Sequence, residues 1–307
     1  MKVVVTGGAG FIGANLCAAL AKAGHDAFAF DDLSTGSADN LDGIDATLVE
    51  GTILDPRALD RVLDRAGAVV HLAARPSVPR SIADPLASHE VNATGTLQVL
   101  EAVRRGPGAH VIVASSSSVY GANPGIPKSE DLVPMPMSPY AASKLATESY
   151  ALAHATSFDL DVLALRFFNV FGPLQPAGHA YAAVIPAFVD AALRGKPLPV
   201  FGDGRQTRDF TFVGTVTAVL ADAVDRRLTS DRPVNLAFGS RVSLLELAEL
   251  LGRILGQDLE LDLGPARVGD VRDSQADQSR LRTLFPDVEP TGLEAGLRAT
   301  VEWFRSR

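Results

Sequence analysis

The feature that most constrains the fold of this chain is a glycine-rich turn close to its first residue. The segment Thr6-Gly-Gly-Ala-Gly-Phe-Ile-Gly13 follows a short β-branched run and leads into an amphipathic stretch. Without side chains, Gly7 and Gly10 allow the backbone to approach a pyrophosphate at a helix N-terminus, where free N–H groups favour anions. We expect Gly13 to let the helix lie close on the sheet. The pattern predicts a strand, a tight turn and a helix that bind a dinucleotide.

Residues 1–170 alternate short apolar runs with longer amphipathic stretches, which is typical of βαβ units around a parallel sheet. The expected strands span residues 2–5, 27–31, 68–73, 110–115 and 160–167. The expected helices between them span residues 12–23, 85–105 and 139–157. We predict an α/β fold in which residues 1–170 form a Rossmann-type, doubly wound parallel sheet.

Proline and glycine become frequent beyond Phe171, and the alternating rhythm breaks. We expect residues 171–307 to form mainly a smaller α/β C-terminal domain that covers the ligand, with a return segment to the first domain near residues 211–238. Helices over residues 244–255 and 293–304 are expected to pack this smaller domain.

The composition argues against several classes of protein. A net charge of −8 without a Lys/Arg block argues against nucleic acid or an anionic membrane as partner. No run reaches the roughly 18 apolar residues of a membrane span, and the first residues lack the pattern of a signal peptide, so we expect a cytoplasmic protein. The single cysteine, Cys17, lies on an apolar helical stretch and is expected in the core. The scattered histidines predict no metal site.

Two acidic residues favour NAD as the dinucleotide. The second expected strand ends in Asp31, whose carboxylate can bond both ribose hydroxyls. A 2′-phosphate would face the charges of Asp31 and Asp32 with no arginine nearby, so the pattern favours NAD over NADP. Asp55, in Gly51-Thr-Ile-Leu-Asp55, follows a further segment that looks like a third strand, and either reaches the adenine amino group or caps a helix that begins at Pro56. The sequence leaves these two interpretations equally open.

A tyrosine and a lysine near the start of one expected helix form a candidate catalytic pair. Tyr140 and Lys144 are four residues apart, so their side chains leave the same helix face. A neighbouring ammonium favours the phenolate and makes the tyrosine a usable base. Ser116 lies in a run of serines at the carboxyl end of a strand, where open α/β sheets bind ligands. A solvated helix face and a solvated serine turn are the alternatives.

Taken together, these residues resemble the extended short-chain dehydrogenase/reductase family, in its branch of NAD-dependent sugar-nucleotide epimerases and dehydratases. The resemblance covers nearly the whole chain. It is carried by TGGAGFIG at 6–13, Asp31, HLAA at 71–74, SSSVYG at 116–121, YAASK at 140–144, RFFNVFGP at 166–173 and GDGRQTRDF at 202–210. It implies a nicotinamide-binding parallel sheet, a smaller C-terminal domain for the sugar nucleotide, and a homodimer formed through a four-helix bundle.

The resemblance also implies roles for individual residues. Tyr140 is the expected base, Lys144 the expected ligand of the nicotinamide ribose, and Ser116 the partner of the sugar's 4-oxygen. The expected cofactor contacts are Gly7, Gly10, Phe11, Ile12, Asp31, Asp32, Ile53, Asp55, Leu72, Ala73, Ala74, Asn92, Tyr140 and Lys144. The expected substrate contacts are Ser116, Ser117, Tyr140, Asn169, Val184, Pro199, Phe201, Arg208, Arg267, Asp270 and Ser274.

Among the expected substrate contacts, Arg208 and Arg267 are expected to bind the diphosphate, because a guanidinium donates two hydrogen bonds to phosphate oxygens. By the same resemblance Asp270 takes the nucleotide ribose, Asn169 faces the sugar or its phosphates, and the strip around Val200 contacts the base. Relatives carry two acidic residues where this chain has Gly214 and Thr215. We expect that difference to affect packing rather than chemistry.

The residues beside Ser116 narrow the reaction. Ser117 and Ser118 stand where dehydrating relatives carry Asp-Glu and decarboxylating relatives keep a glutamate, and serine supplies no strong acid or base. Residues 174–176 lack the arginine by which many glucuronate epimerases hold a carboxylate. The remaining reaction is 4-epimerisation through a 4-keto sugar, with NAD as the hydride acceptor and donor.

A serine at 274 leaves room for an N-acetyl group, and residues 180–186 and 269–274 resemble epimerases that accept UDP-N-acetylglucosamine. We therefore predict UDP-glucose/UDP-galactose and UDP-GlcNAc/UDP-GalNAc as substrates. The alternatives are a dTDP-sugar 4-epimerase or 4-ketoreductase of the same family and, from a different class, a nucleotide-sensing regulator without turnover.

Overall fold

The centre of the protein is a seven-stranded sheet in which every neighbouring pair of strands is parallel. The computed structural model describes residues 1–177, 183–265 and 272–307. The strand order is β11-β6-β5-β4-β1-β2-β3. The strands are β1 (Lys2–Thr6), β2 (Asp26–Asp31), β3 (Ala46–Glu50), β4 (Ala68–His71), β5 (His110–Ser116), β6 (Val162–Phe167) and β11 (Val234–Leu236). The direction of winding reverses between β1 and β4, so the predicted doubly wound α/β fold is confirmed.

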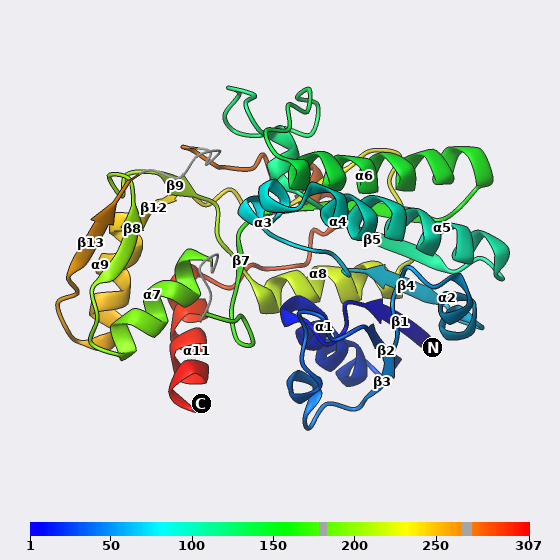
Figure 1. The fold of residues 1–307 in the computed structure, drawn as a ribbon, viewed down its shortest axis with the longest axis horizontal. Helices are drawn as coiled ribbons and strands as arrows, with labels where there is room; N and C mark the ends of the chain where they lie inside the picture. Colours follow the sequence, from blue (N-terminus) through cyan, green and yellow to red (C-terminus); the bar gives the residue numbers. More distant parts are fainter. Residues whose placement is uncertain (178–182, 266–271) are drawn as a thin grey trace.

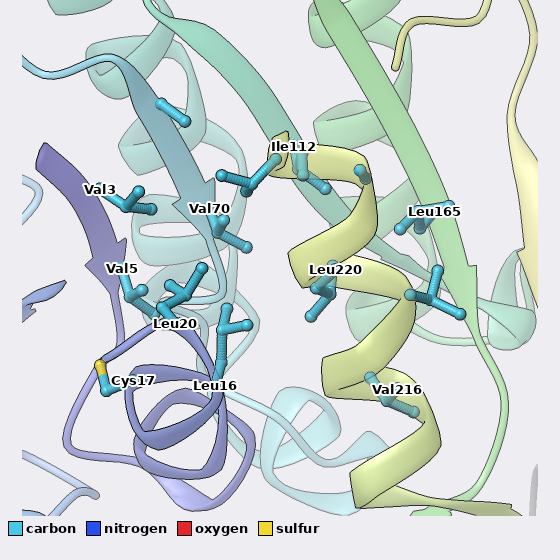
Figure 2. Close-up of a cluster of buried hydrophobic side chains, with 14 of the residues drawn as sticks. Val3, Val5, Leu16, Cys17, Leu20, Val70, Ile112, Leu165, Val216 and Leu220 are labelled. Atoms are coloured by element: carbon cyan, nitrogen blue, oxygen red, sulfur yellow. The ribbon is translucent and has the colours of Figure 1, made fainter. Parts of the chain in front are cut away.

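Helices cover both faces of this sheet, because the side chains of each strand alternate between two apolar clusters (Figure 1). Val3 and Val5 of β1 pack with helices α1 (Phe11–Lys22) and α8 (Val213–Asp225), whereas Val4 packs with α2 (Pro56–Leu63), α5 (Gly95–Arg105) and α6 (Pro139–Phe158). Figure 2 shows the first cluster, in which α1 and α8 present Leu16 and Leu220 to the sheet. Cys17 is fully buried there, as its apolar stretch predicts, and burial raises the pKa of its thiol to about 12.

Helices α2, α3 (Val78–Ala83), α4 (Pro85–His89) and α6 each begin at a side chain that caps the first turn. The 20-residue helix α6 starts at Pro139, and the Ser138 hydroxyl accepts a hydrogen bond from the amide of Ala141. The expected helix over residues 85–105 has no break in the structure, but a π-helical turn over residues 90–94 separates α4 from α5. The elements are α1 (Phe11–Lys22), η1 (Ala38–Leu41), α2 (Pro56–Leu63), α3 (Val78–Ala83), α4 (Pro85–His89), η2 (Glu90–Thr94), α5 (Gly95–Arg105), η3 (Ser117–Tyr120), α6 (Pro139–Phe158) and α8 (Val213–Asp225).

A second apolar core lies in the C-terminal half, around Phe188, Val200, Leu247 and Leu297. Its helices are α7 (Val184–Leu193), α9 (Leu244–Leu255) and α11 (Leu293–Arg305), and α10 (Ser279–Leu284) lies nearer the main sheet. Strand β8 (Leu198–Phe201) pairs with β13 (Leu261–Gly264), β9 (Thr207–Arg208) with β12 (Val242–Ser243), and β7 (Val170–Phe171) with β10 (Thr211–Phe212). Helices α7, α9 and α11 and strands β8 and β13 lie together at the left of Figure 1.

The chain returns from this second core to complete the main sheet. Helix α8 packs along α1, and β11 pairs with β6 in the register Val234↔Leu165. We therefore propose residues 1–170 together with 211–238 as the cofactor-binding part and the rest of 171–307 as the substrate-binding part. In the described part of the chain, no helix has both the length and the apolar character that crossing a membrane requires.

Candidate active site

A cleft of about 1400 Å³ opens at the carboxyl ends of the central strands and reaches into the C-terminal half. The predicted residues that line it are Gly7, Gly10, Phe11, Ile12, Asp31, Asp32, Ile53, Leu72, Ala73, Ala74, Ser116, Ser117, Tyr140, Lys144, Asn169, Arg208 and Ser274. Five other predicted residues do not line it, namely Asp55, Asn92, Val184, Pro199 and Phe201. Arg267 and Asp270 lie outside the described residues. The structure thus brings the expected cofactor turn, the catalytic pair and six of the eleven expected substrate residues to one cleft.

The glycine turn is packed so closely that side chains would not fit. Gly7 has a φ of +71°, and a Cβ on it would lie 2.8 Å from the backbone nitrogen of Ala73. A Cβ on Gly13 would lie 2.1 Å from the carbonyl oxygen of Gly7. The expectation for Gly13 was therefore only approximate, because the close contact joins the helix to the turn rather than to the sheet. A Cβ on Gly8 would lie 2.5 Å from Ala29 Cα, a requirement that the glycine spacing did not reveal.

Asp31 ties this turn to the end of β2. Its Oδ2 accepts a hydrogen bond from the amide of Ala9 at 3.0 Å, and its Oδ1 accepts one from the amide of Leu33 at 2.9 Å. Burial raises the pKa of the carboxyl group, and the two amides oppose that rise. Each oxygen retains capacity to accept a ribose hydroxyl. The open glycine turn and this carboxylate fit a dinucleotide with a free 2′-hydroxyl, while the adjacent Asp32 disfavours a 2′-phosphate.

Asp55 and Asn92 support the wall of the cleft from behind. Asp55 Oδ1 accepts a hydrogen bond from the amide of Arg57 at 2.9 Å, so the structure shows the helix-capping interpretation. Asn92 Oδ1 accepts from the amide of Arg75 at 2.7 Å, and its Nδ2 donates to Ser143 Oγ at 2.9 Å. These bonds hold the segment after β4 against α6. Both residues therefore have supporting roles in the protein, and their contacts with the cofactor stay a prediction.

The catalytic cluster forms where η3 meets the first turns of α6. Ser118 donates to Ser116 Oγ from its amide at 3.2 Å and from its hydroxyl at 2.9 Å, which leaves the Ser116 proton free to be donated. Burial raises the pKa of the Tyr140 phenol, and a side-chain hydrogen bond with Ser116 opposes part of that rise. Lys144 is only 4% exposed, and burial lowers the pKa of its ammonium to about 8. A phenol, a hydroxyl and an ammonium therefore share one buried corner of the cleft.

A buried ion pair anchors the catalytic helix and was not predicted from the sequence. The carboxylate of Glu148 accepts two hydrogen bonds from the guanidinium of Arg166, one from Nε at 2.9 Å and one from Nη2 at 2.7 Å. It also accepts a hydrogen bond from the Ser115 hydroxyl at 2.9 Å. The guanidinium of Arg166 lies over the ring of Tyr120, 4.7 Å from its centroid. Glu148 is four residues after Lys144 and therefore lies on the same face of α6. This spacing could have predicted from the sequence that Glu148 points inward.

A second buried network lies on the other side of Lys144. His71, in the HLAA segment, bonds Thr6 Oγ1 through Nδ1 at 2.7 Å and Thr96 Oγ1 through Nε2 at 3.0 Å. Burial and the positive charge of Lys144 lower the pKa of His71 to about 3. The imidazole is therefore neutral, and it links β1, β4 and α5 beneath the site.

The substrate end of the cleft is organised by Asp209, another residue that the sequence did not indicate. Its Oδ2 accepts from the amide of Ala276 at 3.0 Å, and its Oδ1 accepts from the hydroxyl of Ser240 at 2.9 Å. Burial raises the pKa of the Asp209 carboxyl to about 6, and these hydrogen bonds oppose that rise. The neighbouring Arg208 donates to backbone oxygens of Thr207 and residue 272, at 2.8 and 3.1 Å. Asp209 thus holds together the segments that carry Arg208 and Ser274.

Two expected features of the C-terminal half differ from the sequence interpretation. Pro199 and Phe201 lie on β8 and do not line the cleft, whereas Leu198 and Val200, which alternate with them along the strand, pack into the second core. Val184 begins α7, and the preceding Ala183 lines the cleft in its place. Thr215 accepts a hydrogen bond from the amide of Thr291 at 2.9 Å, so the departure at 214–215 has a packing role, as expected.

This sheet, its glycine turn and the serine, tyrosine and lysine at its carboxyl edge define a nicotinamide-dependent enzyme of the short-chain dehydrogenase type. Residues 3–237 match the model of the family described as "Epimerase: NAD dependent epimerase/dehydratase family". The chain belongs to this family. The predicted family and NAD as the cofactor are confirmed.

Known proteins similar to this chain include several sugar-nucleotide epimerases. The UDP-glucose 4-epimerase of Mycolicibacterium smegmatis is 36% identical over 100% of this chain and 99% of its own length. The solved UDP-N-acetylglucosamine 4-epimerase from Methanobrevibacter ruminantium, in complex with UDP-N-acetylmuramic acid, has a TM-score of 0.93 at 36% identity, with 99% and 98% of the two chains covered. The UDP-glucose 4-epimerase from Thermotoga maritima with UDP-glucose has a TM-score of 0.93 at 34% identity, with 100% and 99% covered.

Proposed function

We propose that this protein is an NAD-dependent UDP-sugar 4-epimerase, an isomerase that acts on UDP-glucose/UDP-galactose and on UDP-GlcNAc/UDP-GalNAc. The observation that carries the proposal is that Ser116, Tyr140 and Lys144 line one cleft with the glycine turn and Arg208. The names of the similar epimerases, at 34–36% identity over nearly the whole chain, support the same reaction.

The cofactor would be held along the carboxyl edge of the sheet. We expect the amides at the N-terminus of α1 to meet its diphosphate and Asp31 to bond its adenosine ribose. Lys144 would hold the nicotinamide ribose. When bound, NAD supplies a reversible hydride acceptor for C4 of the sugar.

Tyr140 is the group that moves the proton of the sugar's 4-hydroxyl. Burial alone raises the pKa of its phenol, so the site must supply positive charge to make it a base. Lys144, with a pKa of about 8, is roughly nine-tenths protonated at pH 7 and supplies that charge. Ser116 donates its hydrogen towards the same oxygen. The proton can then pass between O4 and the phenol as the oxidation state of C4 changes and returns.

The neighbouring side chains favour epimerisation over related reactions. Ser117 and Ser118 line the cleft where elimination or decarboxylation requires an acid or a base, and a serine hydroxyl cannot serve as either near neutral pH. Arg208 lines the same cleft and provides a guanidinium for the diphosphate. Arg267 and Asp270 remain proposed contacts of the diphosphate and the ribose. A nucleotide held firmly at one end leaves the hexose free to present either face of C4.

The direct test is to incubate the purified protein with UDP-glucose and, separately, with UDP-GlcNAc, and to separate the products by chromatography. We expect UDP-galactose and UDP-GalNAc to form without stoichiometric consumption of a nicotinamide cofactor. Formation of neither 4-epimer would refute the proposal. Turnover of dTDP-glucose alone would indicate a dTDP-sugar epimerase, and stoichiometric oxidation of NADH would indicate a ketoreductase.

Substrate size is expected to depend on Ser274, which lines the cleft. A Ser274→Tyr change fills the space proposed for the acetamido group, so we expect kcat/KM for UDP-GlcNAc to fall by roughly 100-fold and that for UDP-glucose by less than about threefold. Steady-state kinetics of one variant on both substrates provides its own control. Equal losses on the two substrates would contradict the size argument.

We also propose a homodimer formed through a four-helix bundle. Large apolar side chains are exposed on helices α3, α4 and α6, namely Ile82 at 56%, Leu86 at 81% and Phe158 at 48%. Light scattering of the purified protein should give twice the 32.2 kDa chain mass, and a mass of one chain would contradict the dimer.

A further inference from the structure

Lys128 is a buried lysine to which the proposed mechanism assigns no role. It lies in the loop between η3 and α6, lines the cleft beside Ser118 and Gly121, and is only 4% exposed. Its Nζ donates a hydrogen bond to the carbonyl oxygen of Asn123. Burial lowers the pKa of its ammonium.

This lysine lacks the usual compensation for burial. Lysine is almost never fully buried unless it is paired, because desolvating an ammonium is costly. Within residues 1–177, 183–265 and 272–307, no carboxylate lies within ion-pair distance of Lys128. An ammonium has three donors, and one peptide carbonyl is the acceptor that the structure gives it. The arrangement therefore has room for an acceptor that a ligand would bring.

The backbone of Lys128 is paired with the segment that follows Ser274. Its amide donates to the carbonyl of Gln275 at 2.7 Å, and its own carbonyl accepts from the amide of Asp277 at 3.0 Å. A parallel bridge joins it to Ala276. Lys128 is thus bonded to residues 275–277, which directly follow Ser274, the residue proposed to leave room for an acetamido group.

Besides the bond from Lys128 Nζ, the loop has hydrogen bonds that do not involve this side chain. Asn123 donates from Nδ2 to the carbonyl of Val133 at 3.0 Å and accepts from the amide of Gly125 at 2.9 Å. The amide of Ala122 donates to the carbonyl of Met135 at 3.0 Å, which closes the base of the loop. These bonds do not involve the ammonium, and its own bond to the Asn123 carbonyl uses one of its three donors, so the remaining donors can serve a ligand.

We propose that Lys128 is a specificity-determining residue that donates a hydrogen bond from Nζ to the acyl oxygen of a 2-acetamido group on the substrate hexose. The inference rests on the proposed 4-epimerase function. An acetamido carbonyl is the same chemical group as the peptide carbonyl that already accepts from Nζ. Ser274 provides the space for the group and Lys128 provides its hydrogen-bond donor.

The test compares Lys128→Met, which keeps an aliphatic stem without a donor, with Lys128→Gln, which keeps an N–H donor without the charge. For the methionine variant we expect kcat/KM to fall roughly 10- to 100-fold on UDP-GlcNAc and less than about threefold on UDP-glucose, as the loss of one charge-assisted hydrogen bond requires. The glutamine variant should retain UDP-GlcNAc turnover within about tenfold of the wild type. Lys196→Met, which changes an exposed lysine of the C-terminal half, should behave as the wild type.

Each outcome separates this inference from the proposed function. Equal losses on UDP-glucose and UDP-GlcNAc, no loss on either, or a glutamine variant as impaired as the methionine variant would overturn the role of Lys128. A wild type that epimerises UDP-glucose but not UDP-GlcNAc would overturn it as well and leave the 4-epimerase assignment standing. A wild type inactive on both refutes the proposed function itself. The melting temperature of each variant, and its bound NAD, establish that the loop has folded.

Discussion

Replacing Tyr140 with phenylalanine is expected to lower kcat/KM by about 10²- to 10⁴-fold on every UDP-sugar that the wild-type enzyme epimerises. The change removes the one oxygen that the proposed mechanism uses to take and return the proton of the 4-hydroxyl. Ser116 cannot replace it, because an alcohol is not a base near neutral pH. The measurement is the initial rate of 4-epimer formation for the purified variant.

Tyr150 provides the control, because it lies on the same helix but is 42% exposed and does not line the cleft. Tyr150→Phe should retain wild-type rates. The Tyr140→Phe protein should keep its melting temperature and its capacity to bind NAD, since neither depends on the phenolic oxygen. Retention of more than about one-tenth of the wild-type rate would contradict the assignment of Tyr140 as the base.

Breaking the buried ion pair behind the catalytic helix is expected to have the largest effect on stability. In an Arg166→Met variant, Glu148 becomes a buried carboxylate without its cation, and we expect the free energy of unfolding to fall by about 3–5 kcal/mol. Urea denaturation followed by circular dichroism measures this difference. Because Glu148 lies one turn beyond Lys144, we also expect the variant to lose activity.

The double variant Arg166→Met/Glu148→Leu distinguishes the pair from simple packing. Replacing both charges with apolar side chains removes the uncompensated carboxylate, so most of the lost stability should return. An exposed pair gives the matched comparison. Arg298 and Glu294 form an ion pair with side chains 57% and 56% exposed, and Arg298→Met should change the free energy of unfolding by less than about 1 kcal/mol. A double variant less stable than the single one would contradict this account.

Local sequence signals predicted the elements of the fold where a cap or a breaker marks their ends. The expected helix over 244–255 has the bounds of α9, because Ser243 forms a capping box with Glu246 and Gly256 adopts the left-handed conformation after the last turn. The expected helix over 139–157 ends within one residue of α6. Five of the seven strands of the parallel sheet, β1, β2, β4, β5 and β6, were predicted from their short apolar runs.

Pairings between distant segments could not be predicted in this way. Strand β11 spans only three residues, and its place beside β6 depends on register rather than on composition. The inward positions of Arg166 and Asp209 were missed for the same reason. A charged residue is ordinarily exposed, and only the partner that the fold brings to it shows that it is buried.

The same distinction between local motifs and distant pairings holds for the candidate site. Residues in motifs that adjoin strand ends, such as Asp31, Ser116 and Tyr140, line the cleft as expected. Pro199 and Phe201 do not, because their place depends on how β8 packs in the C-terminal half, where Leu198 and Val200 are the residues that enter the core. Asp55 caps α2 through one hydrogen bond from the amide of Arg57, and its expected contact with the adenine stays a prediction.

The position of β11 at the edge of the main sheet has a consequence for biosynthesis. A polypeptide emerging from the ribosome exposes the free edge of β6 and the uncovered face of α1 until residues 213–236 have been translated. Such an edge is a template for intermolecular strand pairing. We therefore expect nascent chains stalled before this point to be clients of chaperones, and the N-terminal half expressed by itself to aggregate.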